Sequence, residues 1–410
     1  MMWCAALLAG LVLVGRVAAD EMDPARLDGM TAEASQPWRE YLERSTRLAA
    51  RDASALQAEV TAIGAAQAVK APGGGDFRLP DDDGDVEWYA GDEAARLADA
   101  IVSFQSPSGG WSKHIGYAKG PRRPGMQWTS QSDPGKHPHY LATFDNGATV
   151  NEIAFLAAVW AATGREDCRA AVLRGLDFVL DAQYPHGGWP QVYPLEGGYH
   201  DNVTFNDNAM TNVLSLLQAT LEGDRRYACV DDDRRRRLAA AFDRGVAFVL
   251  AAQVSMGGRK TVWCAQHDPL TLEPTAARAF EPASLSGVES AHLLKFLMGI
   301  PKPSPEVIAS IEAGLAWLEE AEVKGLAKVK RDGRTVYVAD ASSADTYWAR
   351  FYDLATGKPF FPGKDGIVYR SFEEMAAAND KLGYDYYSTQ PGSIVRTQQK
   401  KWRKRLQEAR

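Results

Sequence analysis

The sequence has few cysteines, no excess of positive charge and no apolar run long enough to cross a membrane. Its 410 residues include four cysteines, none in the Cys-x-x-Cys spacing of a structural zinc site. The formal net charge of −7 argues against nucleic acid or an anionic membrane as the partner. Long stretches of alternating apolar and polar residues are also missing, which argues against a major sheet. With 45% apolar residues, the chain can still bury a large core.

The N-terminus carries a short apolar run at residues 3–15. Its length suits the apolar region of a secretory signal peptide, and a membrane span would need about 20 residues. Small residues at positions 17–19 provide a cleavage site. We therefore expect residues 1–19 to be a signal peptide and the protein to be secreted or periplasmic. A buried or disordered N-terminal helix is the alternative, because no Lys or Arg precedes the run.

A loop motif recurs three times along the chain. The segments "FQSPSGGWSK", "AQYPHGGWPQ" and "AQVSMGGRKTVW" carry Gln105, Gln183 and Gln253 in the same position. Each motif follows an amphipathic helical stretch and precedes a second helix, so a helix pair of about 70 residues repeats. The repeat predicts a mainly α protein, an α/α toroid-like barrel of repeated helix pairs with small β elements in long loops. We expect a monomer with a single domain over residues 20–410 and a core at about 85–390.

Polar residues gather where the second helix of each pair is expected to begin. "TFDNGATVNEIAFLA" opens with Asp145 and Asn146, "FNDNAMTNVL" contains Asp207, and "RAFEPASLSG" opens with Arg278. Equivalent helix ends of a repeat lie on one face, so Asp145, Asp207 and Arg278 are predicted to converge at one mouth of the toroid. A plain N-cap is the alternative for each aspartate, and an ordinary surface cation is the alternative for the arginine.

Two of these helix starts also have the spacing of a capping box. Thr149 precedes Glu152 by three residues, and Ser286 precedes Glu289 by three residues. In a capping box the hydroxyl and the carboxylate each accept a backbone N–H at the start of the helix. The spacing therefore predicts that both pairs cap their helices.

Several blocks together resemble the family 10 pectate lyases. "SPSGGWSKH", "TFDNGATVNEIAFLA", "QYPHGGWPQVYP", "FNDNAMTNVL" and "ARAFEPASLSG" occur in the order and spacing of that family, and "DTYWARFYD" and "GKDGIVYRSFEE" continue the resemblance. It covers about residues 85–390. The resemblance implies an α/α toroid-like fold and calcium-assisted β-elimination of α-1,4-linked polygalacturonate, which yields 4,5-unsaturated oligogalacturonates. Polygalacturonate is then the expected partner of the protein.

The resemblance also implies roles for the polar residues at the helix starts. Arg278 corresponds to the catalytic base, which removes the C5 proton of a uronate. Asp145, Asn146 and Asp207 are the predicted Ca²⁺ ligands, because calcium prefers carboxylate and amide oxygens. A divalent cation on the uronate carboxylate stabilises the enolate-like intermediate. An arginine that stays protonated could instead bind that carboxylate as a bidentate pair, with another group taking the proton.

Further residues are predicted to bind the substrate. Lys113, Arg350 and Arg370 are candidates for binding the carboxylates of flanking uronates. Tyr347 and Trp189 are candidates for stacking on sugar faces. For an isolated cation the alternative is a solvated surface position, and for an aromatic residue it is core packing.

Two other functions remain open from the sequence. An inverting glycoside hydrolase on an α/α toroid could use Asp145 and Asp207 as its acid and base, although that reaction gives Arg278 no role. A non-catalytic carbohydrate-binding protein could use the same aromatics and cations. The products distinguish these functions, because only a lyase leaves a double bond between C4 and C5.

Overall fold

Helices dominate the computed structural model, which describes residues 21–80, 86–133, 136, 139–331 and 333–408. The predicted signal peptide lies outside these residues. Across the described ranges, no helix combines the length and the apolar character needed to cross a membrane. The mainly α fold class that the sequence predicted is confirmed.

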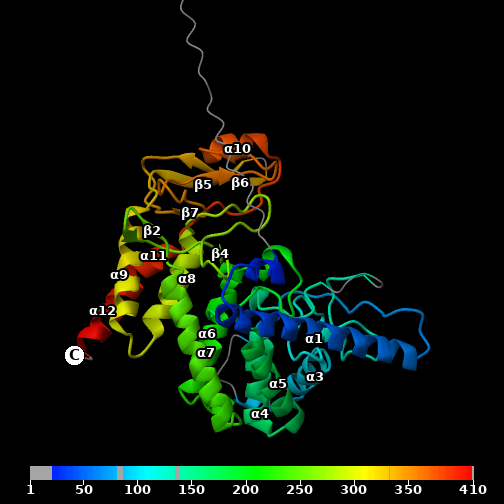
Figure 1. Cartoon of the computed structure of the whole chain (residues 1–410). Helices are drawn as coiled ribbons and strands as arrows, with labels where there is room; N and C mark the ends of the chain where they lie inside the picture. The colour runs from blue at the N-terminus through cyan, green and yellow to red at the C-terminus, as the bar shows by residue number, and fades with distance from the viewer. Residues whose placement is uncertain (1–20, 81–85, 134–135, 137–138, 332, 409–410) are drawn as a thin grey trace, which may run out of the picture.

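The body of the molecule is a double row of helices (Figure 1). The outer row comprises α3 (Asp92–Ser103), α5 (Glu166–Ala182), α7 (Asp232–Ala251) and α9 (Pro305–Glu320). The inner, more buried row comprises α4 (Val150–Thr163), α6 (Ala209–Leu221) and α8 (Gly287–Gly299). Successive helices contact one another within each row, and each inner helix also packs against its outer neighbours. This is the repeated pairing of helices that the loop motif predicted.

Other helices flank the double row. The long α1 (Ala32–Ala62) begins at Thr31, whose hydroxyl accepts the backbone N–H of Ala34, and it packs against α5. The remaining helices are short: α2 (Val86–Tyr89), α10 (Phe372–Ala378), α11 (Pro391–Ser393) and α12 (Gln399–Glu408). In Figure 1 the C-terminal α12 lies beside α9, at the end of the array.

The strands are short and pair antiparallel in two-stranded sheets. The longest pair is the hairpin β5 (Leu326–Arg331) and β6 (Arg334–Ala339), in which Leu326 lies opposite Ala339. The other pairs are β1 (Val203–Thr204) with β4 (Gln266–His267), β2 (Ser255–Met256) with β3 (Arg259–Lys260), β7 (Trp348–Ala349) with β10 (Tyr387–Ser388), and β8 (Phe361–Pro362) with β9 (Val368–Tyr369). We call residues 326–388 the C-terminal lobe; its hairpin and α10 form the upper part of Figure 1.

The glutamine of each loop motif ties one unit of the array to the next. Its side-chain amide donates one hydrogen bond to a carbonyl of its own loop and another to a carbonyl of the next outer helix. The acceptors lie at 2.8–3.0 Å and are Gly109 and Ala171 for Gln105, Gly187 and Ala241 for Gln183, and Thr261 and Ser310 for Gln253. The motif therefore recurs because each joint between outer helices needs the same two hydrogen bonds.

A tryptophan repeats with the same regularity and reveals a further unit. The indole N–H of Trp111, Trp189 and Trp263 donates to a carbonyl near the end of the preceding outer helix, at 2.7–2.8 Å. Trp348 makes the same bond at 2.8 Å to Leu318 of α9. The loop after α9 lacks the glutamine motif, so the sequence pattern missed this unit.

Close contacts between the rows fix which inner residues are equivalent. A glycine on each of three outer helices leaves room for an aliphatic side chain of an inner helix. A Cβ on these glycines would lie 2.7–2.8 Å from that side chain; the pairs are Gly175 with Ile153, Gly245 with Leu214, and Gly314 with Leu294. Ile153, Leu214 and Leu294 therefore occupy the same place in successive units.

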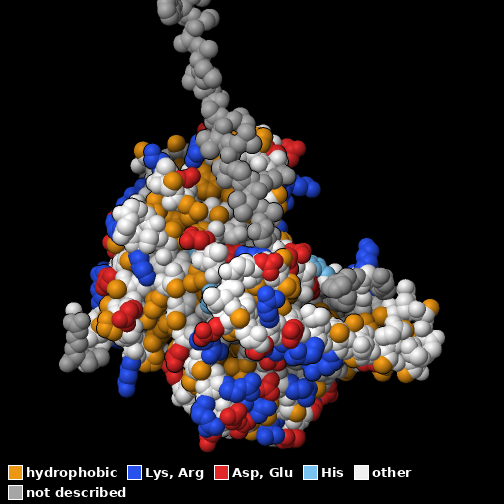
Figure 2. Space-filling view, viewed as in Figure 1, with side chains coloured by type: hydrophobic (Ala, Val, Ile, Leu, Met, Phe, Trp, Pro, Cys, Tyr) orange, Lys and Arg blue, Asp and Glu red, His pale blue; other side chains and the backbone are white. Residues whose placement is uncertain are grey.

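The viewed surface carries charges of both signs. In Figure 2 the Lys and Arg side chains are interspersed with Asp and Glu over the lower part, and apolar side chains gather over the upper part. The net charge of −7 is therefore not concentrated in a single acidic field on this face.

Candidate active site

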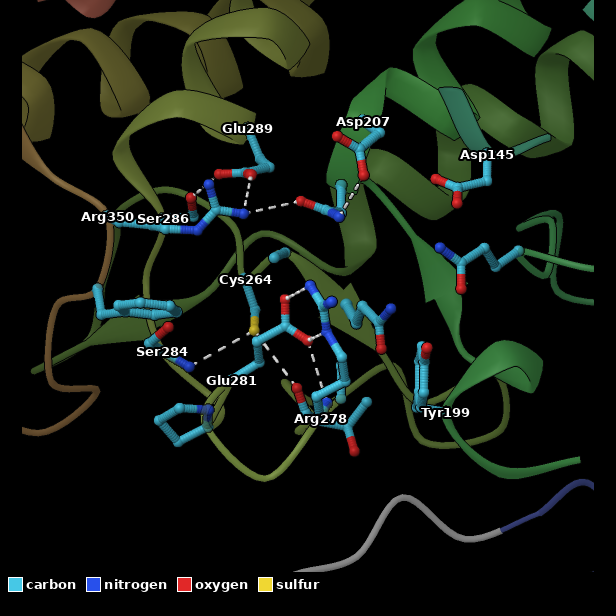
Figure 3. Close-up of a pocket in the computed structure, with 18 of the residues that line it drawn as sticks. Asp145, Tyr199, Asp207, Cys264, Arg278, Glu281, Ser284, Ser286, Glu289 and Arg350 are labelled. Carbon is cyan, nitrogen blue, oxygen red and sulfur yellow. Dashed lines mark hydrogen bonds and ion pairs between the residues drawn. The ribbon is translucent and has the colours of Figure 1, made fainter. Parts of the chain in front are cut away.

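Many of the predicted site residues line one pocket that is partly open to solvent. It lies beside the starts of the inner helices and is closed on one side by the loop before α8 (Figure 3). The predicted residues that line it are Lys113, Asp145, Asn146, Asp207, Arg278 and Arg350. The array thus brings together residues that are more than 200 positions apart in the sequence.

Two of these residues adopt the left-handed backbone conformation. Asn146 has φ 54° and Asp207 has φ 51°, within the short turns η3 (Asp145–Gly147) and η5 (Asn206–Asn208) that precede α4 and α6. Asn and Asp tolerate this region better than most residues. No side-chain hydrogen bond caps η3, η5, α4 or α6. Asp145 and Asp207 therefore do not act as plain N-caps.

The repeat relates these residues differently from the prediction. Counting back eight residues from each equivalent aliphatic position places Asp145 with Asn206 and with Ser286. Asp207 then corresponds to Asn146, and the two share nearly the same backbone conformation. The expected equivalence of Asp145, Asp207 and Arg278 is wrong, because Arg278 lies in the loop nine residues before α8 begins.

Neither predicted capping box is formed. The Thr149 hydroxyl accepts the backbone N–H of Trp111 at 3.0 Å, and the buried Glu152 accepts the hydroxyl of Tyr117. Ser286 donates to Glu289, whose carboxylate faces the pocket. Thr149 and Glu152 thus bond to distant loops, whereas Ser286 and Glu289 bond to each other and leave the backbone N–H groups uncapped.

Asp145 and Asp207 lie side by side in the pocket lining, with different partners (Figure 3). Lys113 Nζ lies 2.5 Å from Asp145 Oδ2, whereas Asp145 Oδ1 is buried without a partner in the described part of the chain. Asn206 Nδ2 donates to Asp207 Oδ2 at 2.6 Å. Burial, together with the charges of Asp145 and Glu289, raises the pKa of Asp207 to about 6.

The charges that line the pocket do not balance. Three cations each lie beside a carboxylate, with Lys113 beside Asp145, Arg278 beside Glu281, and Arg350 beside Glu289 at 3.4 Å. Asp207 is the fourth carboxylate of the lining, and no ion pair joins it to a cation in the ranges that the structure describes. The pocket therefore carries one excess negative charge.

An excess of negative charge and an unpartnered, buried carboxylate oxygen both suit a bound cation. A divalent cation would offset the repulsion that raises the pKa of Asp207 and would satisfy Asp145 Oδ1. Asn146 Nδ2 donates to Asp76 at 3.0 Å, so its amide oxygen is the atom that it can offer. The described residues include no group of three or more His, Cys, Asp or Glu side chains arranged for a metal. Other ligands would have to complete the shell.

Arg278 is held by a carboxylate and a tyrosine. Its Nε donates to Glu281 Oε2 at 2.6 Å, and its Nη2 donates to Glu281 Oε1 and to Tyr384 Oη, both at 2.8 Å. The Glu281 carboxylate raises the pKa of Arg278 above its usual value. In this arrangement Arg278 is a cation whose side chain is 46% exposed towards the pocket.

Arg350 and Lys113 are the other two cations that line the pocket. Arg350, directly after β7, donates to Asn206 Oδ1 at 3.0 Å, and its guanidinium carbon lies 4.1 Å from the centroid of the Tyr384 ring. Lys113 Nζ lies 3.7 Å from the centroid of the Tyr140 ring. A cation over an aromatic face is stabilised by the ring quadrupole, so both charges are held in place within the lining.

The structure contradicts two of the predicted substrate-binding roles. Trp189 is 1% exposed and belongs to the core through its bond to Val179, so its ring has no free face for a sugar. Tyr347 is 3% exposed, and its ring packs against Tyr337 and Tyr387. Arg370 is exposed after β9 and does not line the pocket, so its role towards flanking uronates stays a prediction. Periodicity could not separate these cases, because a core aromatic and a sugar platform look alike in sequence.

Several lining residues could not be recognised from the sequence or fitted another role. Glu289 was read as part of a cap, and Glu281, three residues after Arg278, had a spacing that could have suggested an ion pair. Tyr140 and Tyr199 line the pocket from irregular loops, and Tyr384 lies behind the arginines. No local pattern marks a tyrosine in a loop as part of a site.

Comparison with known proteins agrees with this picture. Residues 105–395 match the family described as pectic acid lyase. Two solved structures of a family 10 polysaccharide lyase from Cellvibrio cellulosa are similar, each with 33% sequence identity and a TM-score of 0.64. A mutant in complex with trigalacturonic acid aligns over 79% of this chain and 99% of its own, and the other structure over 78% and 98%. No curated protein sequence matches the chain.

Proposed function

The chain belongs to the pectic acid lyase family, and from that premise we propose that it is a secreted or periplasmic pectate lyase that cleaves α-1,4-linked polygalacturonate by calcium-assisted β-elimination. One observation carries the proposal: two carboxylates of adjacent units face a pocket that also presents Lys113, Arg278 and Arg350. The complex of the Cellvibrio enzyme with trigalacturonic acid supports polygalacturonate as the substrate.

The reaction requires positive charge around an anionic substrate. β-Elimination removes the C5 proton of a uronate and expels the C4 oxygen as the double bond forms. The C5 proton is weakly acidic, because the adjacent carboxylate is already negative. Lys113, Arg278 and Arg350 bind and orient this carboxylate and its neighbours through charge-assisted hydrogen bonds.

The residues present fit a calcium ion. Asp145 and Asp207 would hold it, with the amide oxygen of Asn146 as a further ligand, and the substrate would complete the shell. When bound, the ion acts as a Lewis acid on the uronate carboxylate. It also reverses the charge of the pocket, since one excess negative charge becomes one excess positive charge and a polyanion is then attracted.

We assign Arg278 as the base that removes the C5 proton. Glu281 keeps the guanidinium protonated in the arrangement seen here, so this arrangement binds a carboxylate but cannot accept a proton. Burial beneath a bound sugar disfavours the charged form and lowers the pKa of the arginine while Glu281 still orients it. Arg278 thus acts as a base only after the substrate has covered it.

The products test the proposal. Purified protein with polygalacturonate and calcium should release oligogalacturonates whose C4–C5 double bond absorbs in the ultraviolet. A hydrolase that used Asp145 and Asp207 would instead give saturated products, each heavier by one water. Mass spectrometry separates the two results, and binding without cleavage would favour the non-catalytic function. Saturated products or no products would overturn the proposed reaction and leave the fold unaffected.

A further inference from the structure

Tyr384 lies between the two arginines of the pocket. Its hydroxyl accepts a hydrogen bond from Arg278 Nη2 at 2.8 Å, and its ring lies beneath the guanidinium of Arg350, with 4.1 Å between the guanidinium carbon and the ring centroid. The residue belongs to the C-terminal lobe, between α10 and β10. One side chain of the lobe therefore contacts Arg278 of the array and Arg350 of the lobe itself.

Glu281 completes the arrangement around Arg278. Its two carboxylate oxygens accept the Nε and Nη2 protons of Arg278, and one of them also accepts the Arg278 backbone N–H at 3.1 Å. Glu281 is shielded from solvent, with 13% of its side chain exposed, and it also accepts the hydroxyl of Tyr384. The three side chains thus close a triangle behind the part of Arg278 that faces the pocket, as Figure 3 shows for the pair of Arg278 and Glu281.

We propose that Glu281 and Tyr384 are positioning residues that fix the plane of the Arg278 guanidinium over the pocket and its placement relative to Arg350. The proposal rests on the proposed lyase function and adds to it. Neither residue has to touch the substrate. Both act through Arg278.

An unsupported arginine could not hold such a geometry. Its side chain has several rotatable bonds, and Arg278 lies in an irregular loop between β4 and α8. A bidentate carboxylate sets the plane of a guanidinium as well as its position, which a single hydrogen bond does not. Because elimination depends on alignment with the C5–H bond, a displacement of about 1 Å costs on the order of 100-fold in rate.

The arrangement also makes the C-terminal lobe part of the active site. The lobe packs its own aromatic cluster around Phe372 and Tyr387, and Tyr386 of the same segment bonds to the Pro362 carbonyl. Tyr384 is held at the edge of this cluster through contacts with Phe351 and Tyr386. The lobe thereby sets the position of the Arg278 charge.

Two variants with a matched control test the proposal. Glu281→Gln keeps the shape and removes the charge, and Tyr384→Phe keeps the ring beneath Arg350 and removes the hydroxyl. Tyr369→Phe is the control, since that hydroxyl also bonds to a carboxylate of the lobe, Asp365, but does not line the pocket. The assay measures kcat and KM on polygalacturonate across pH, together with thermal unfolding.

We expect kcat to fall about 100-fold in Glu281→Gln and about tenfold in Tyr384→Phe, which loses the hydrogen bonds of its hydroxyl with Arg278 and Glu281. KM and the melting temperature should change little, and the control should match the wild type. In Glu281→Gln the rising limb of kcat against pH should also move to lower pH, because the neighbouring carboxylate that raises the pKa of Arg278 is gone; Tyr384 and Tyr199 remain near it in this variant.

The proposal is overturned if an active wild type tolerates both changes, or if kcat falls only in proportion to a loss of folded protein. It is also overturned if the loss in both variants appears in KM, with kcat unchanged. An inactive wild type that releases no unsaturated product would be a different result, because it refutes the lyase function itself.

Discussion

Replacing Asp207 by Asn should make the protein more stable and nearly inactive. The amide has the shape of the carboxylate but no charge, so it removes both the desolvation of a charged group and the repulsion from Asp145 and Glu289, which together raise the pKa of Asp207. The backbone should not be strained, since Asn tolerates a φ of 51° and Asn146 already has φ 54° at the equivalent position. The same change removes a predicted calcium ligand.

The expected gain in stability follows from the shifted pKa. A change from 3.8 to about 6 corresponds to an upper bound of about 3 kcal/mol. Asp207 is surrounded by the groups of the pocket but is exposed to the solvent within it, so this solvent screens much of the energy and we expect about 1 kcal/mol. For a chain of this length, that energy corresponds to a rise of roughly 1–3 °C in melting temperature.

The gain should depend on pH in a defined direction. The folded protein binds a proton at Asp207 more tightly than the unfolded chain does, because the folded pKa is the higher one. The wild type therefore gains stability as the pH falls through about 6 towards 3.8, whereas Asp207→Asn has no such gain. The advantage of the variant should be complete above pH 6 and should close over that window.

Thermal unfolding of calcium-free protein from pH 8 to pH 4, with a separate rate assay in added calcium at each pH, measures both effects. Asp231→Ala serves as a control, because Asp231 does cap a helix by accepting the backbone N–H of Arg234. That variant should melt earlier and keep its turnover. If Asp207→Asn melts earlier than the wild type and keeps normal turnover, Asp207 is an ordinary helix-start residue and our reasoning is refuted.

Three further predictions concern the metal, the arginine and the array. Exhaustive chelation should abolish activity, and added calcium should restore it. Added calcium should also raise the melting temperature of the wild type but not of Asp207→Asn. Full activity after chelation would contradict the cation site. Arg278→Lys should lose most of its kcat although the charge is kept, since lysine lacks the planar fork that pairs with Glu281, and a near-normal rate would remove Arg278 from the chemistry. Gln183→Ala should cost roughly 2–4 kcal/mol of folding free energy, because two buried carbonyls lose their donor and Arg244 loses an acceptor. Denaturant unfolding should show this loss, and KM should not change. A variant as stable as the wild type would contradict the role given to the loop motif.

The sequence predicted the architecture because the fold repeats short-range patterns. Amphipathic stretches mark helices wherever one face is buried, and Gln105, Gln183 and Gln253 recur because the same joint recurs. The unit built on Trp348 escaped notice since its loop carries the tryptophan without the glutamine. The pattern therefore revealed the fold wherever its units share the same local sequence.

The site was harder to predict because its details depend on contacts between distant loops. The left-handed backbone at Asn146 and Asp207 turns the chain just before the inner helices. As a result, Asp207 is equivalent to Asn146 and not to Asp145, a difference of one residue. Arg278 reaches the pocket from a loop, and its charge is fixed by Glu281 and by Tyr384 from the C-terminal lobe. Propensities and periodicity describe single segments and carry no information about contacts between loops that are far apart in the sequence.

The hydrogen bonds that join successive units have a consequence for how a protein with this helical array can change in length. Each glutamine bonds forward to the next outer helix, and each joint uses the same two acceptor positions. A unit that was duplicated within the row would find matching partners on both sides, so growth needs no newly invented interface. The pocket draws residues from several units and from the lobe, and would not survive an insertion between them. Lengthening is therefore tolerated at the ends of the array, whereas the centre is fixed by its chemistry.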